Sequence, residues 1–154
     1  MENLRSAFTM VELVFVVAAI AILAALSLPK LAATRDDAKM SRLAQNSMTG
    51  AFEIASYATA RGETEKNLSL MSNAISLMIE QEEAVQPDPN TPQLDINWKS
   101  QPCLILRIEN QGANTETLTI TADDNNTDDG CKRLQSLIDM GQFPMLLRGT
   151  HISY

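Results

Sequence analysis

The sequence has very little histidine and cysteine. Its single histidine is His151, and its two cysteines are Cys103 and Cys131. Their spacing matches neither C-x-x-C nor a zinc pattern, and one histidine cannot complete a Cys/His ligand set. No nucleophile elbow, P-loop or dinucleotide-binding fingerprint occurs, and no two carboxylates form a recognisable acid–base pair. We therefore expect no enzyme activity, no catalytic residues and no resident cofactor.

Positively charged residues are also few. Lysine and arginine together number 12 against 19 aspartates and glutamates, which gives a formal net charge of -7. An acidic surface repels nucleic acid and anionic lipid headgroups at long range. Lys132 and Arg133 could offer a small basic patch to DNA, but the acidic balance argues against it. No nucleic-acid partner is favoured.

The two cysteines leave two options open. In an exported protein, one disulfide closing the loop between Cys103 and Cys131 would stabilise the fold by roughly 3–4 kcal/mol. In a cytosolic protein they would be two buried thiols. The N-terminal segment decides between these compartments.

That segment contains a long apolar run, Phe8–Leu28, of 21 residues in which only Thr9, Glu12 and Ser27 are polar. As a helix it would span about 31 Å, which matches the hydrocarbon thickness of a bilayer. A secretory signal peptide has a more basic start and a shorter apolar region. A buried helix of a soluble protein would need more surrounding chain than is present here. We expect a membrane-spanning helix over residues 8–28.

Glu12 is the unusual residue of this run. An ionisable side chain inside a membrane segment costs at least a few kcal/mol near the bilayer centre, and it usually has a partner. The segment itself supplies no positive charge. The partner must come from another molecule or be created by cutting the chain.

The stretch "AFTMVELVFVVAAIAILAALSLP" resembles the class III signal of type IV pilins and type II secretion pseudopilins over residues 1–35. That signal has a short leader, a cleavage point before phenylalanine, a glutamate five residues into the mature chain, an apolar stretch and a proline beyond it. The resemblance implies that residues 1–7 are a prepilin leader peptide cleaved between Ala7 and Phe8. It also implies N-methylation of Phe8, an assembly role for Glu12 and a helix kink at Pro29. The chain departs from the family at Ala7, where glycine is strongly preferred.

The resemblance implies a function as well. Cleavage by prepilin peptidase would create an α-amine on Phe8, and in a filament this amine could neutralise Glu12 of a neighbouring subunit. The chain would then be a structural subunit of a type IV pilus or of a type II secretion or competence pseudopilus. Its partners would be itself and other pilin-like subunits, prepilin peptidase, an inner-membrane assembly platform and membrane lipid.

The same resemblance places the chain in the bacterial inner membrane as a single-pass protein with its head in the periplasm. Flanking charge alone would not give this orientation, because basic residues are more numerous after the apolar run than before it. An exported head favours a disulfide between Cys103 and Cys131 over free thiols. The alternative function is a membrane-anchored periplasmic binding or adhesion domain that does not polymerise.

Residues 29–62 continue as an amphipathic helix. Apolar or small side chains recur three to four residues apart, at Met40, Ala44, Ser47/Met48, Ala51, Ile54/Ala55 and Ala58. Arg61 followed by Gly62 predicts the end of the helix. Gly50 weakens the helix by about 1 kcal/mol relative to alanine.

Residues 63–154 are expected to form a globular pilin-like head. The pattern predicts a second helix over 65–84, with the acidic residues Glu80, Glu82 and Glu83 on a solvated face, and then a proline-rich loop. Strands are predicted at Cys103–Glu109 and Glu116–Ala122, a short helix from Cys131, and a last strand over 145–154. Trp98 is expected in the core or at a sheet edge. The predicted fold class is α+β, a long N-terminal helix packed on a small antiparallel sheet.

The loop "DDNNTDDG" over 123–130 raises the question of calcium. Asp124, Asn126 and Asp128 alternate like the start of an EF-hand loop, but Gly130 comes one position late and Gln135 stands where a bidentate glutamate is needed. We favour a solvated turn in which Asp128 or Asp129 caps the following helix. Calcium remains a weak alternative, with Asp124, Asn126 and Asp128 as its candidate ligands.

Overall fold

The structure is a computed structural model that describes residues 8–112 and 115–148, with only the backbone described for 26–33. It divides into two compact units, Met1–Ala38 and Lys39–Tyr154. The predicted leader, residues 1–7, and the end of the predicted last strand, with His151, lie outside the described residues.

The longest element is helix α1, Met10–Arg61. Its helical backbone continues through Pro29, so the proline does not end the helix, and a kink at this position stays a prediction. The helix ends as predicted, because Gly62 adopts a left-handed φ of 72° and donates its N–H to the carbonyl of Ala58 at 2.8 Å. Among the described residues, no helix combines the length and the apolar character that a membrane crossing requires.

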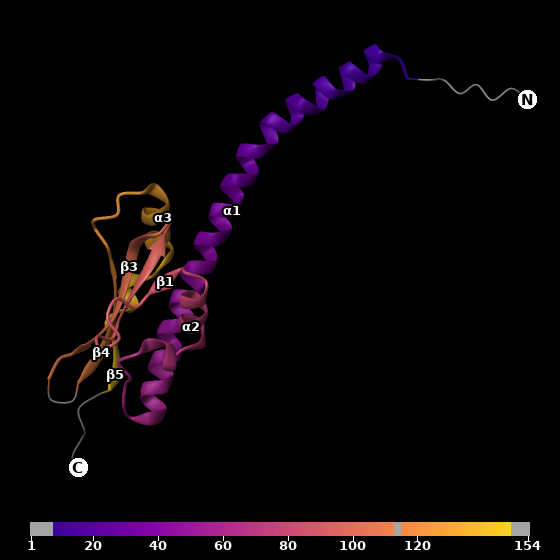
Figure 1. The fold of residues 1–154 in the computed structure, drawn as a ribbon. Helices are drawn as coiled ribbons and strands as arrows, with labels where there is room; N and C mark the ends of the chain where they lie inside the picture. The colour runs from indigo at the N-terminus through magenta and orange to yellow at the C-terminus, as the bar shows by residue number, and fades with distance from the viewer. Residues whose placement is uncertain (1–7, 113–114, 149–154) are drawn as a thin grey trace, which may run out of the picture. The chain divides into compact units, whose positions relative to one another are not determined.

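The second unit contains a five-stranded antiparallel sheet in the order β1-β2-β3-β4-β5 (Figure 1). Its strands are β1 Ala84–Val85, β2 Gln93–Trp98, β3 Gln101–Asn110, β4 Glu116–Ala122 and β5 Met145–Arg148. The central hairpin β3–β4 confirms the two predicted strands. The described part of the predicted last strand is present as β5.

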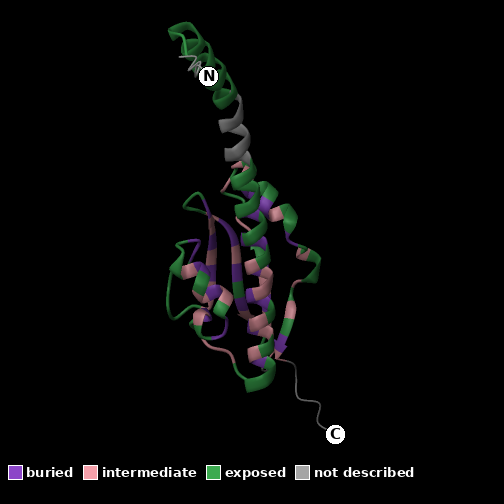
Figure 2. Ribbon diagram, turned by 90° about the vertical axis from the view of Figure 1, so that its right-hand side faces the viewer, coloured by how far each residue is buried: buried purple, intermediate pink, exposed green. Residues whose placement is uncertain are grey.

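Helix α1 from Lys39 onward lies against one face of this sheet, and the buried residues of both face each other (Figure 2). The predicted helical stripe is confirmed at Met40, Ala44, Ser47, Ala51, Ile54 and Ala58, and Leu43 joins it. Leu94, Ile96, Leu104, Leu106, Leu118 and Ile120 are among the buried strand residues opposite. The fold is therefore α+β, a long N-terminal helix packed against a five-stranded antiparallel sheet.

The prediction of one helix over 65–84 is wrong. This stretch forms a 3-10 turn, η1 Leu68–Leu70, and a shorter helix, α2 Asn73–Glu80. Ser72 interrupts it because its hydroxyl accepts a hydrogen bond from the Ile75 N–H at 3.1 Å and so caps α2. Glu53 of α1 accepts from the Ser72 hydroxyl at 2.6 Å and from the Ala74 N–H at 3.1 Å. These bonds, that of Ser72 first, lower the pKa of Glu53.

Gly50, the expected weak point of the helix, lies where α2 packs closely on α1. A Cβ added there would lie 2.9 Å from Cγ1 of Ile75, a buried residue of α2. The missing side chain therefore allows the two helices to pack.

Glu83 does not belong to a solvated face as predicted. Its side chain is 6% exposed and forms an ion pair with Arg42 of α1, while its second oxygen, Oε2, is buried without a hydrogen-bond partner among the described residues. Arg42 also donates to Gln81. Burial of this carboxylate is tolerated because an arginine from a distant part of the chain reaches it.

Replacing Arg42 by alanine should lower the free energy of unfolding by about 1–3 kcal/mol, because a buried carboxylate loses its charged partner. This expected loss of free energy is smaller than the loss on breaking a fully buried ion pair, since the Arg42 side chain is 47% exposed. Urea unfolding of the full chain measures it. Adding Glu83→Gln should recover much of the loss, and an Arg42→Ala variant as stable as the wild type would contradict this role of the pair.

Candidate functional site

The candidate assembly site is the N-terminal part of α1, and its apolar side chains are exposed in the first unit. Exposed large apolar residues are Phe8, Met10, Val11, Leu13, Val14, Phe15, Val16, Val17, Ile20, Ile22 and Leu23. They are distributed around the helix, with no polar face opposite. A helix that is apolar on all sides requires lipid or other helices around it. In the structure this segment is exposed, and none of its residues belongs to the described hydrophobic core.

Glu12 is the one ionisable residue between Met10 and Ala25, and it lies in the first turn of α1. Its Oε2 accepts hydrogen bonds from the Thr9 N–H at 3.0 Å and from the Thr9 hydroxyl at 2.9 Å. The Glu12 N–H donates in return to the Thr9 hydroxyl at 3.2 Å. The two residues form a capping box, which satisfies the N–H groups of Thr9 and Glu12 where the helix begins.

Thr9 is a site residue that the sequence reasoning missed. The signal was present, since "TMVE" over 9–12 fits the S/T-x-x-E pattern of a helix start. Of the predicted cleavage pair, Phe8 precedes this cap directly and Ala7 lies outside the described residues. Glu12 Oε1 accepts no hydrogen bond from the described residues, so this oxygen is open to a donor from another molecule.

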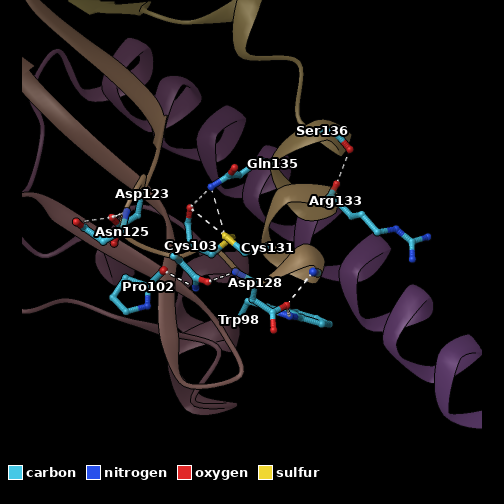
Figure 3. Close-up of a disulfide and its surroundings, with 12 residues drawn as sticks. Trp98, Pro102, Cys103, Asp123, Asn125, Asp128, Cys131, Arg133, Gln135 and Ser136 are labelled. Carbon is cyan, nitrogen blue, oxygen red and sulfur yellow. Dashed lines mark hydrogen bonds between the residues drawn. A yellow bond between two sulfur atoms is a disulfide. The ribbon is translucent and has the colours of Figure 1, made fainter.

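The predicted disulfide is confirmed. Cys103 of β3 and Cys131 of helix α3, Asp129–Leu137, are bonded, with their Cα atoms 5.6 Å apart (Figure 3). Both cysteines are fully buried. The amide of Gln135 donates to the Cys103 carbonyl at 3.1 Å and so covers the bridge. The disulfide ties α3 to the central hairpin.

A hydrogen bond between Trp98 and Asp128 makes a second connection between the sheet and α3, beside the disulfide. Trp98 is 2% exposed, and its indole Nε1–H donates to Oδ1 of Asp128 at 2.9 Å (Figure 3). Asp128 caps α3, accepting from the Gly130 N–H at 2.8 Å. This bond, with smaller contributions from Trp98 and Lys99, lowers the pKa of Asp128. Lys39 and Lys99 lie over the indole ring, 5.9 and 5.7 Å from its centroid.

Two of the three calcium candidates, Asn126 and Asp128, are engaged in other contacts. Asp128 is the helix cap, as the favoured interpretation predicted, and Asn126 donates to the Pro102 carbonyl at 2.9 Å. Asp124 is exposed in the turn. A hollow of about 400 Å³ is lined in part by Asn126 and Asp128. Within the described residues, no three or more histidine, cysteine or acidic side chains gather closely enough to hold a metal ion.

Gly130 fits beneath Trp98, and this fit gives a further prediction. A Cβ at this position would lie 2.4 to 2.8 Å from indole atoms, so the ring or the start of α3 must move. Gly130→Ala should lower the free energy of unfolding by about 1–3 kcal/mol through overpacking. It should also shift the fluorescence of Trp98, the only tryptophan. Ser136→Ala, on the exposed face of the same helix, is the matched control and should change neither quantity noticeably.

Comparison of the chain with protein-family models, with curated proteins and with solved structures gave no match.

Proposed function

We propose that this chain is a structural subunit of a filament, a type IV pilus or a type II secretion or competence pseudopilus, that polymerises through residues 8–28. The observation that carries the proposal is the exposed apolar helix with a single carboxylate, Glu12, in its first turn. The resemblance of residues 1–35 to the class III signal supports the same function. Prepilin peptidase would cut between Ala7 and Phe8, and Phe8 would be methylated.

The proposed mechanism rests on two charges, the Phe8 α-amine and the Glu12 carboxylate. Burying either of them in an apolar environment without a partner costs free energy. Cleavage creates an α-amine on Phe8, four residues before Glu12, and both would lie in lipid or in the filament core. An amine of one subunit can donate to Glu12 of the next, which neutralises both charges. The two Thr9 bonds use Oε2 of Glu12, so Oε1 is open to the incoming amine. Thr9 thus holds the carboxylate of Glu12 in position before the subunit is incorporated into the filament.

The second unit would be the head of the subunit, exposed to the periplasm and carried by a single membrane helix. The Cys103–Cys131 disulfide suits an oxidising compartment. Work would be done by a separate ATPase and an inner-membrane platform. The chain itself supplies the helix that is extracted from the membrane and stacked. No enzymatic step is assigned to it.

The mass of the mature protein tests the proposal. We expect loss of the seven residues "MENLRSA" and gain of one methyl group on Phe8. Terminal sequencing by tandem mass spectrometry of the membrane-extracted protein measures both. An intact N-terminus would favour the second candidate, a membrane-anchored periplasmic binding or adhesion domain that does not polymerise.

A further inference from the structure

The turn between β4 and α3 carries a sequence pattern that the proposed function does not use. Asn125-Asn126-Thr127 fits N-x-S/T, the acceptor pattern for N-glycosylation. The pattern occurs once more, at Asn67-Leu68-Ser69. An acidic residue stands two positions before each asparagine, Asp123 and Glu65. The two sites are therefore matched in sequence, and the structure distinguishes them.

Asn67 is held in place by its neighbours. Its side-chain oxygen accepts from the Ser69 N–H at 3.1 Å and from the Ser69 hydroxyl at 2.7 Å, and it caps η1. Leu68, the middle residue of the pattern, is fully buried in the core. A transferase could take up this segment only if Leu68 left the core, which exposes apolar surface to water. The folded protein does not present Asn67 as an acceptor.

Asn125 lies at the surface, in a turn without a buried apolar side chain. Asn125 and Thr127 are exposed, and both line the rim of the 400 Å³ hollow. The Asn125 amide Nδ2 donates to Asp123 at 2.8 Å (Figure 3). Asn126 is held by hydrogen bonds to the Pro102 carbonyl and from the Asp128 N–H. Opening this turn exchanges a few hydrogen bonds with water and exposes no core.

We propose that Asn125 is an N-glycosylation site of the folded head and that its substrate class is a lipid-diphosphate-linked oligosaccharide. Nδ2 of Asn125 attacks the anomeric carbon, a carbon–nitrogen bond forms, and the bond from that carbon to the diphosphate oxygen breaks. The lipid diphosphate leaves with the electron pair, and the amide proton passes to a carboxylate base of the transferase. No oxidation or reduction is involved. In the cell this requires export of the head, a part of the proposed function.

The test compares folded and unfolded acceptors. Full-length protein with its disulfide intact is incubated in detergent with a membrane oligosaccharyltransferase and a lipid-diphosphate oligosaccharide of known mass. A second sample is first reduced, alkylated and unfolded. Trypsin places the two asparagines on separate peptides, 67–99 and 108–132, so mass spectrometry reports each site independently. The folded sample should carry the glycan on 108–132 at least tenfold more than on 67–99, and the unfolded sample should carry it on both.

Variants assign the glycan to the turn. Asn125→Gln and Thr127→Val should remove it from peptide 108–132, and Thr127→Ser should retain it. The proposal is overturned if unfolded protein accepts glycan at Asn125 and folded protein does not, or if folded protein accepts it equally at Asn67. Because the assay involves neither leader cleavage nor polymerisation, its failure would leave the filament proposal intact, and the reverse also holds.

Discussion

Replacing Glu12 by alanine should abolish incorporation of the subunit into filaments while leaving the protein in the membrane. In the proposed filament this change would leave the Phe8 amine of the neighbouring subunit without its partner, and breaking a buried ion pair in this way costs roughly 3–5 kcal/mol. A cost of that size lowers incorporation by about 100-fold or more. Quantifying the subunit in sheared filaments against the membrane fraction measures the effect.

The stability of the second unit serves as the control, because it shows whether Glu12→Ala disturbs the fold. Glu12 belongs to the unit Met1–Ala38, whereas the core is built from residues of Lys39–Tyr154. Thermal unfolding of the head should therefore be the same in Glu12→Ala and in the wild type. Glu12→Gln, which keeps the size and loses the charge, should fail to assemble as well. Normal incorporation of either variant would remove the basis for the charge-pair mechanism.

The elements that could be predicted from the sequence are those with strong local signals. The stripe at Met40 to Ala58 repeats at helical spacing, and Gly62 gives a definite stop. The two strands of the central hairpin are rich in β-branched and aliphatic residues. The disulfide required a different argument, because the resemblance of the N-terminus to an export signal had to supply the oxidising compartment.

Strands β1 and β2 were not predicted from the sequence, and each has a physical reason. β1 has two residues, Ala84–Val85, too few to produce a pattern. β2 does alternate, with Leu94, Ile96 and Trp98 buried and the residues between them half-buried, but it follows directly on a proline-rich loop. A period-2 count across "QLDINW" would have found it.

Buried polar groups were the least predictable features. Glu83 ends an acidic run, and such runs are usually solvated. Its burial depends on Arg42, 41 residues earlier in the chain, and no local pattern links the two. Beside the disulfide, the cap at Asp128 could be predicted because capping is local. Its bond to Trp98, 30 residues away, required the folded sheet.

Removing the disulfide should produce the largest loss of stability in the head. The bridge joins residues separated by 28 positions, and opening a loop of that length costs about 3–4 kcal/mol through the entropy of the unfolded chain. We expect the double variant Cys103→Ala/Cys131→Ala to lose that much free energy of unfolding in urea. Alanine is preferred to serine because both positions are fully buried and a hydroxyl there would need a hydrogen-bond partner.

The urea dependence separates this cause from a loss of native packing. Without the cross-link the unfolded chain expands and exposes more surface, so the m-value should rise. Reducing agent should bring the wild type to the stability of the double variant and leave the variant unchanged. A variant that lost the same free energy with an unaltered m-value would point to the native contacts of α3 with β3. Unchanged stability would mean that Trp98, Asp128 and the buried Leu134 of α3 hold this helix without the bridge.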